Sequence, residues 1–226
     1  MLKYQKNLME KTNKIFAVYG AGGCGRGLIS FVKENFNSKN TRIVFVDDFS
    51  KEKKVDGFDV LKYSAFKSIK TKYKYITIGI ANVNERKKIS KIIKKDKINF
   101  FSLYSKQSII FNKFNIGKGA CISPFVTITS NVKIGSFFHA NLYSYVEHDC
   151  EIGNYVTFAP GVKCNGNIII NDNCYIGSGV IIKNGKPKNK LIIGENSVIG
   201  AGAVVTKNVP KNSILVGNPA KNLLKK

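Results

Sequence analysis

The chain has 226 residues, a formal net charge of +23 and 43% hydrophobic residues. This length is enough for two compact units, and no segment approaches the ~20 apolar residues that span a bilayer, which argues against a membrane partner. Nearly all the positive charge is lysine, since only Arg26, Arg42 and Arg86 are arginines, and it is spread along both halves. Nucleic-acid-binding proteins tend to cluster arginine and aromatic residues on one face, so we expect no nucleic-acid partner.

The N-terminal residues and the cysteines both indicate a cytoplasmic protein. The first 14 residues are lysine-rich but lack the apolar run of a secretory signal. The five cysteines are scattered and never spaced as a zinc knuckle. Unpaired, reduced cysteines are the usual state in the cytoplasm.

The first half of the chain alternates strand-like and helix-like segments. We expect strands at 14–19, 42–48, 73–80 and 98–104, with a helix after the first strand and a second, lysine-rich helix at 84–95. This alternation is typical of a small parallel sheet, so residues 1–108 are predicted to form a truncated Rossmann-like α/β domain.

A glycine-rich turn follows the first of these strands. Gly20, Gly22 and Gly25 satisfy the dinucleotide fingerprint, in which backbone N–H groups and a helix N-terminus face a phosphate. Asp47 and Asp48 end the next strand, where a carboxylate can bind a ribose or a base. A nicotinamide dehydrogenase also carries this pattern, but only half of that fold fits here. Glycines that serve only a tight turn are the other alternative, and we favour a nucleotide-linked diphosphate.

From Ile116 onward, an aliphatic or small apolar residue returns at every sixth position. A period of six fits neither a helix nor an ordinary strand, but three hexads make one triangular coil of a left-handed parallel β-helix. Residues 109–226 are therefore predicted to form this solenoid with a C-terminal cap. The hexad positions are Ile116, Ile122, Ile128, Ile134, Ala140, Val146, Ile152, Phe158, Cys164, Ile170, Ile176, Ile182 and, after a five-residue insertion, Ile193, Ile199 and Val205.

Residues 18 apart stack one coil above another, so the repeat predicts where side chains meet. His148 lies beneath Gly166, which brings an imidazole to about one strand spacing, ~4.8 Å, from a backbone N–H. This pairing suits acyl transfer, because the imidazole takes a proton from an attacking amine or hydroxyl while the amide stabilises the oxyanion. Glu147 and Asp149 flank His148, and a carboxylate on the far ring nitrogen would fix its tautomer.

Two further features of the solenoid bear on whether it holds a zinc ion and on where coenzyme A binds. His139, the other of the two histidines, has apolar neighbours and is expected to be structural; two histidines cannot supply a three-histidine zinc site. The five-residue insertion lies within 183–190, and counting across it places Ser178 one coil below Ala201. Its lysines suit the phosphates of coenzyme A, although a solvated turn explains them equally well.

The segments YVEHDCEIGNYVTFAPGVKCNGN and IGAGAVVTKNVPKNSILVGNPAK resemble the bacterial sugar acetyltransferases of the left-handed β-helix superfamily. The resemblance covers almost the whole chain and is strongest to the sialic acid O-acetyltransferases and the N-acetyltransferases of nucleotide-linked 4-amino-4,6-dideoxy sugars. The ending is shared by many acetyltransferases, whereas EHDC in this two-domain layout is much more specific. The resemblance implies acetyl-CoA as co-substrate, no metal and a homotrimer with each active site between two β-helices.

The resemblance also implies roles for individual residues. His148 would be the general base and Asp149 the acid that orients it. Where many relatives carry a second histidine near acetyl-CoA, this chain has Thr157. The remaining positions fall into two groups: Gly166, Ser178 and Ala201 for acetyl-CoA, and Gly22, Gly23, Cys24, Asp47, Asp48 and Gly79 for the nucleotide sugar.

Three functions remain in competition at the level of sequence. The leading hypothesis is acetyl-CoA-dependent N-acetylation of a nucleotide-linked 4-amino-4,6-dideoxy sugar for surface-glycan synthesis, by direct attack with His148 as base. The second is O-acetylation of a sialic acid or related sugar, which needs no nucleotide in the N-terminal domain. The third is a non-enzymatic nucleotide-binding or assembly protein, which predicts no acetyl-CoA turnover.

Overall fold

The computed structural model describes residues 14–111 and 114–223. The lysine-rich N-terminal segment, apart from Lys14, lies outside the described residues. Contacts divide the chain into two units, of which the first holds residues up to Ala81 together with Lys88–Leu103. The second holds Asn82–Lys87 and the chain from Tyr104 onward. No helix in the part of the chain described here is long and apolar enough to cross a membrane.

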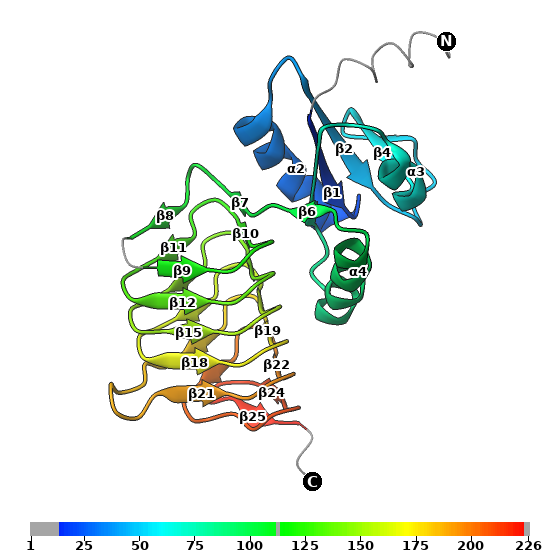
Figure 1. Ribbon diagram of the computed structural model, residues 1–226. Coiled ribbons are helices and arrows are strands. Elements are labelled where there is room, and N and C mark those ends of the chain that lie inside the picture. Colours follow the sequence, from blue (N-terminus) through cyan, green and yellow to red (C-terminus); the bar gives the residue numbers. More distant parts are fainter. Residues whose placement is uncertain (1–13, 112–113, 224–226) are drawn as a thin grey trace. The chain divides into compact units, whose positions relative to one another are not determined.

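The first unit is built on a mainly parallel sheet with the strand order β3-β4-β2-β1-β5-β6 (Figure 1). Strand β1 is a buried apolar run, the last three residues of β2 and of β5 are buried beside it, and α2 packs against β1 and β2. In chain order, the elements are β1 (Lys14–Tyr19), α2 (Gly23–Phe36), β2 (Thr41–Val46), β3 (Lys54–Val55), β4 (Phe58–Leu61), α3 (Tyr63–Ser68), β5 (Tyr73–Ile78), α4 (Val83–Lys95) and β6 (Asn99–Phe100). The first turn of α4, up to Lys87, belongs to the second unit.

The predicted α/β domain with a small parallel sheet is confirmed, with differences in detail. The hairpin of β3 and β4 and the short helix α3 were not predicted. The strand predicted at 98–104 is two strands, because β6 joins the first sheet and Leu103–Tyr104 forms β7 in a different sheet. A continuous apolar run in the sequence does not indicate that its two halves pair with strands of different sheets.

The second unit is a parallel β-helix whose coils stack three sheets of short strands (Figure 1). Of the three sheets of this β-helix, one contains β7 (Leu103–Tyr104), β10 (Cys121–Ile122), β13 (His139–Ala140), β16 (Thr157–Phe158), β19 (Tyr175–Ile176), β22 (Val198–Ile199), β24 (Ile214–Val216) and β25 (Lys221–Asn222). The second contains β8 (Ile109–Ile110), β11 (Thr127–Ile128), β14 (Tyr145–Val146), β17 (Lys163–Cys164), β20 (Ile181–Ile182) and β23 (Val204–Val205). The third contains β9 (Phe114–Ile116), β12 (Val132–Ile134), β15 (Glu151–Ile152), β18 (Ile168–Ile170) and β21 (Leu191–Ile193).

The hexad residues form the core of this solenoid, which confirms the predicted β-helix. From Ile122 to Val205 every predicted hexad position is buried, and Ile116 is partly buried at the first coil. The register is 18 residues, as in the pairing of Cys164 with Ile182. Across the insertion it becomes 23, since Ile168 pairs with Leu191.

The corners of the coils use left-handed backbone conformations. Asn131, Asp149 and Asn167 occupy equivalent corners with φ of +56°, +60° and +60°. Asn and Asp tolerate this region better than most residues because their short polar side chains make local hydrogen bonds. One column of corners therefore brings three polar side chains to successive coils, next to the predicted catalytic histidine.

Candidate active site

His148 lies directly against Gly166, one coil above it. A Cβ built on Gly166 would come within 2.6 Å of both Cε1 and Nε2 of the imidazole. Any side chain at position 166 would therefore displace the ring. Among the described residues, Gly166 N–H donates no hydrogen bond, while its carbonyl accepts one from Gly185 N–H at 2.9 Å. Gly166 is itself buried, so this amide lies beside the imidazole with no hydrogen-bond acceptor among the described residues.

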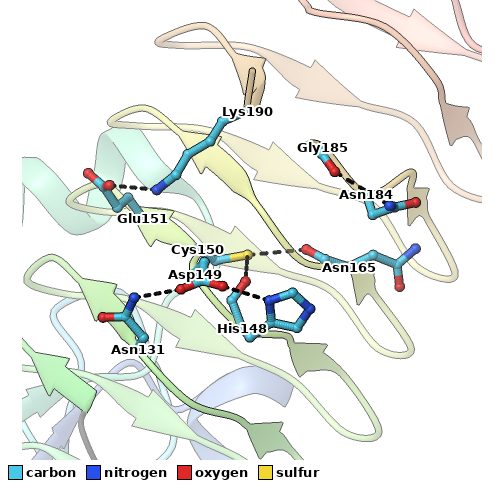
Figure 2. Close-up of polar contacts among 9 residues, drawn as sticks. All are labelled: Asn131, His148, Asp149, Cys150, Glu151, Asn165, Asn184, Gly185 and Lys190. Atoms are coloured by element: carbon cyan, nitrogen blue, oxygen red, sulfur yellow. Dashed lines mark hydrogen bonds and ion pairs between the residues drawn. The ribbon is translucent and has the colours of Figure 1, made fainter. Parts of the chain in front are cut away.

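Asp149, rather than Glu147, contacts the far side of the imidazole. Its Oδ2 lies 2.8 Å from His148 Nδ1 (Figure 2). This contact favours the tautomer that carries a proton on Nδ1 and leaves the Nε2 lone pair facing Gly166. The side chain of His148 is 53% exposed, so Nε2 is accessible to a substrate.

The residues on either side of Gly166 are held by hydrogen bonds to the coil that carries His148. The buried thiol of Cys150 donates to the carbonyl of Asn165 at 3.1 Å (Figure 2), and Tyr145 Oη donates to Asn165 Oδ1 at 2.8 Å. Asn167 N–H donates to the carbonyl of His148 at 3.0 Å. The turn that carries Gly166 is therefore fixed relative to His148 by its own hydrogen bonds.

Two residues that sequence reasoning did not assign also lie beside the dyad. Asn131 Nδ2 donates to Asp149 Oδ1 at 2.6 Å, and Lys190 Nζ lies 2.8 Å from Glu151 Oε1 (Figure 2). Hydrogen bonds from Asn131 and His148, together with the charge of Lys190, hold the pKa of Asp149 below its ordinary value. Counting 18 residues back from Asp149 gives Asn131, so the repeat itself carried the signal for this residue. No comparable pattern points to Lys190, which lies in the insertion, between Gly185 and the next paired strand at Leu191.

Ser178 and Ala201, assigned to acetyl-CoA by resemblance, lie in register on neighbouring coils. The carbonyl of Ser178 accepts from Gly202 N–H at 2.8 Å, and both Ser178 and Ala201 are exposed. The adjacent corners are Gly179 and Gly202, where an added Cβ would meet nothing within 4 Å. The column therefore presents small side chains and open space to an elongated ligand.

Thr157 is placed differently from these residues. Its side chain is buried, and Arg86 Nη2 lies 2.8 Å from both Thr157 Oγ1 and the carbonyl of Tyr155. Arg86, at the start of α4, is itself fully buried. The Thr157 hydroxyl is thus engaged by a guanidinium within the second unit. His139, one coil below Thr157 in the same sheet, is buried too.

The glycine-rich turn lies in the first unit, between β1 and α2. A Cβ on Gly25 would clash with the carbonyl oxygen of Gly20, and one on Gly79 would lie 2.7 Å from Gly25 Cα. These two glycines therefore allow close packing of the turn. Gly22 and Gly23 are exposed, and an added Cβ at either would meet nothing within 4 Å. Cys24 follows in the first turn of α2, which contains no acidic residue.

Asp47 and Asp48 are both engaged by neighbouring groups of the first unit. The Asp47 carboxylate accepts hydrogen bonds at 2.9 Å from the backbone N–H groups of Ala21, Phe49 and Ser50. Partial burial by itself raises the pKa of Asp47, but these donors outweigh it and hold the pKa below its ordinary value. Asp48 accepts from Tyr19 Oη at 2.5 Å while remaining exposed. The two carboxylates thus shape the loop beside the glycine-rich turn.

Comparison with known proteins assigns the family. Residues 15–93 match the PglD N-terminal domain family. The chain is 46% identical over 180 residues to a GDP-perosamine N-acetyltransferase of Escherichia coli O157:H7, covering 78% of this chain and 81% of that protein. The structure of WeeI from Acinetobacter baumannii AYE matches with a TM-score of 0.89 and 45% identity, over 93% of this chain and all of that one. This chain belongs to the hexapeptide-repeat sugar N-acetyltransferase family.

Two solved structures of more distant proteins share the fold. The acetyltransferase domain of PglB from Neisseria gonorrhoeae FA1090, in complex with acetyl coenzyme A, matches with a TM-score of 0.83 at 24% identity and covers 94% of this chain and all of that one. PerB from Caulobacter crescentus, in complex with CoA and GDP-perosamine, matches with a TM-score of 0.69 at 19% identity and covers 92% and 96%. At these identities, the two similarities show only that this chain shares the fold of those proteins. Within the described residues, no cluster of three or more His, Cys, Asp or Glu side chains is arranged to hold a metal ion.

Proposed function

We propose that this acetyltransferase transfers the acetyl group of acetyl-CoA to the amino nitrogen of GDP-perosamine or a closely related GDP-linked 4-amino-4,6-dideoxy sugar, for surface-glycan synthesis. The observation that carries the proposal is the 46% identity to a GDP-perosamine N-acetyltransferase across 81% of that relative. The arrangement of His148 between Asp149 and Gly166 supports it, because these groups supply the base and the oxyanion donor of an acyl transfer.

The proposed reaction is a direct attack without a covalent acyl-enzyme. The sugar amine attacks the thioester carbonyl, and a C–N bond forms as Nε2 of His148 takes the amine proton. The Gly166 N–H donates to the oxygen of the tetrahedral intermediate. The C–S bond then breaks, and the imidazolium returns the proton to the departing thiolate. Asp149, on Nδ1, stabilises the imidazolium that forms during the step.

For the nucleotide, we propose a site on the first unit. The N-terminus of the 14-residue helix α2, with exposed Gly22 and Gly23 and the Cys24 N–H, supports binding of a diphosphate. Asp47 keeps the adjacent loop in place, and Asp48 offers an exposed, pre-positioned carboxylate to the nucleoside. Gly79 contributes by allowing the close approach to Gly25.

For acetyl-CoA, we propose the column of small residues at Ser178 and Ala201. Their exposure and the open space at the neighbouring Gly179 and Gly202 support a groove of this kind. The lysine-rich loop at 183–190 precedes β21 and carries the positive charge that the phosphates of coenzyme A require. Because the Thr157 hydroxyl is hydrogen-bonded to Arg86, we expect Thr157 to support the acetyl-CoA site only through that contact.

We also propose that the enzyme works as a homotrimer in the cytoplasm, where acetyl-CoA and nucleotide sugars are made. Exposed apolar side chains on the β-helix, including a stacked pair formed by Phe125 and Tyr143, support self-association. Light scattering should give a mass three times that of the 25.1 kDa chain. A mass equal to that of a single chain at micromolar concentration would contradict the trimer.

The test of the activity is a thiol-release assay with acetyl-CoA across GDP-, UDP- and dTDP-linked 4-amino sugars and free sialic acid. GDP-perosamine is expected to give the highest kcat/KM, and mass spectrometry of the product should place the acetyl group on nitrogen. Turnover of sialic acid with an ester product would instead favour the O-acetyltransferase hypothesis. Absence of thiol release with every acceptor would refute both.

A further inference from the structure

The carboxylate of Asp149 is held from two sides. Its Oδ2 contacts His148 Nδ1 at 2.8 Å, while its Oδ1 accepts from Asn131 Nδ2 at 2.6 Å (Figure 2). We propose that Asn131 is a positioning residue for the acetyl transfer, which keeps Asp149 turned toward His148 and thereby keeps Nε2 available as the base. This inference rests on the proposed role of His148.

The geometry of the β-helix makes this contact possible. Asn131 and Asp149 occupy the same corner on successive coils, both with left-handed backbone, and the strands that follow pair Lys133 with Glu151. Asp149 N–H also donates to the carbonyl of Ser130 at 3.2 Å. Two side chains that leave equivalent corners one coil apart are separated by about a strand spacing, ~4.8 Å between backbones. An amide and a carboxylate of this length fill that gap with one hydrogen bond.

The exposure of Asp149 explains why such a partner matters. Its side chain is 41% exposed, so water competes for both oxygens and the carboxylate is otherwise able to rotate away from the imidazole. A charge-assisted hydrogen bond is about twice as strong as a neutral one, so Asn131 opposes this rotation. The other charged or titratable groups around Asp149 are His148, the Cys150 thiol and Lys190, which is itself paired with Glu151.

The substitution Asn131→Asp tests the inference because it keeps the shape and the left-handed backbone but replaces the donor with a second carboxylate. Two carboxylates at this distance share one proton at low pH and repel each other once both are ionised, so the pKa of the pair rises. We expect kcat to fall by about tenfold or more as the pH rises through the ionisation of the pair. KM for acetyl-CoA and for the sugar should stay within about twofold of wild type, because neither ligand contacts Asn131 in the proposed reaction. Asn131→Ala, which lacks both donor and charge, should lose about tenfold in kcat at all pH values.

A spectroscopic readout separates positioning from folding. The chain has only two histidines, so the ¹⁵N signals of His148 are identified by comparison with His148→Ala. Wild type should show Nδ1–H as the dominant neutral tautomer, and Asn131→Asp at high pH should lose this preference. A purely structural role for Asn131 would leave the tautomer unchanged.

The matched control is Asn196→Asp. Asn196 has φ of +59° at another corner, and its Nδ2 donates to Asn212 Oδ1 at 3.1 Å, so the same chemical change is made in a side-chain ladder that does not touch His148. This variant should keep the wild-type kcat and pH profile. If Asn131→Asp also keeps both while His148→Ala is inactive, the inference about Asn131 is wrong and the proposed function stands. An active His148→Ala would contradict the proposed function itself.

Discussion

The imidazole of His148 leaves no room for a side chain at position 166, and this allows a quantitative prediction. In Gly166→Ala, the new Cβ would lie 2.6 Å from Nε2 and Cε1, whereas ordinary contact begins near 3.4 Å, so the imidazole must retreat by about 0.8 Å. The backbone N–H of position 166 is retained. Because a misplacement of about 1 Å can cost on the order of 10²-fold, we expect kcat/KM to fall by about that factor.

Folding should be little affected, because the side chain of His148 is 53% exposed and can move toward solvent. The assay is thiol release from acetyl-CoA with GDP-perosamine, together with thermal unfolding. Gly27→Ala is the control, since a Cβ at this exposed helical position meets nothing within 4 Å. If Gly166→Ala retains wild-type kcat/KM while His148→Ala does not, the imidazole does not work from its position against Gly166.

Three further predictions concern stability. Arg86→Ala should lower the free energy of unfolding by roughly 2–4 kcal/mol in a denaturant titration, because it leaves buried acceptors, including Thr157 Oγ1, without this donor; a change below about 0.5 kcal/mol would contradict this. The pKa of Asp47 is lowered in the folded state, so its contribution is present above the unfolded pKa of ~3.9 and is lost as the pH falls. Asp47→Asn should therefore show a weaker loss of melting temperature between pH 6 and pH 3 than wild type, and an equal loss would refute this reasoning. Lys190→Ala removes the ion pair with Glu151, which is partly exposed, and should cost less than about 1 kcal/mol, with a smaller effect at high salt; a larger, salt-independent loss would argue against a simple ion pair.

Much of the second unit could be predicted from the sequence because each hexad residue has one local requirement, an apolar side chain that points inward. The same periodicity related His148 to Gly166 without reference to any structure. It also relates Asp149 to Asn131, which lies 18 residues earlier and therefore one coil below. The side-chain hydrogen bond itself depends on rotamers that the repeat does not determine.

Other features depend on contacts that have no local pattern. Arg86 reaches Thr157 across 71 residues, and nothing in the helical periodicity of α4 distinguishes Arg86 from its neighbouring lysines. Lys190 lies in the insertion, where the 18-residue register is interrupted, so its ion pair with Glu151 could not be predicted by counting residues. In the first unit, the glycine spacing predicted a turn before a helix, but not that Asp47 would fold the following loop around its own carboxylate.

The central claim is that His148 accepts the proton of the attacking amine. The most direct measurement is kcat/KM for wild type and His148→Ala with acetyl-CoA and GDP-perosamine, with circular dichroism to verify that both proteins are folded. The account predicts that the folded variant is slower by roughly 10²–10⁴-fold, the contribution of a general base. A folded His148→Ala with kcat/KM close to wild type would contradict it.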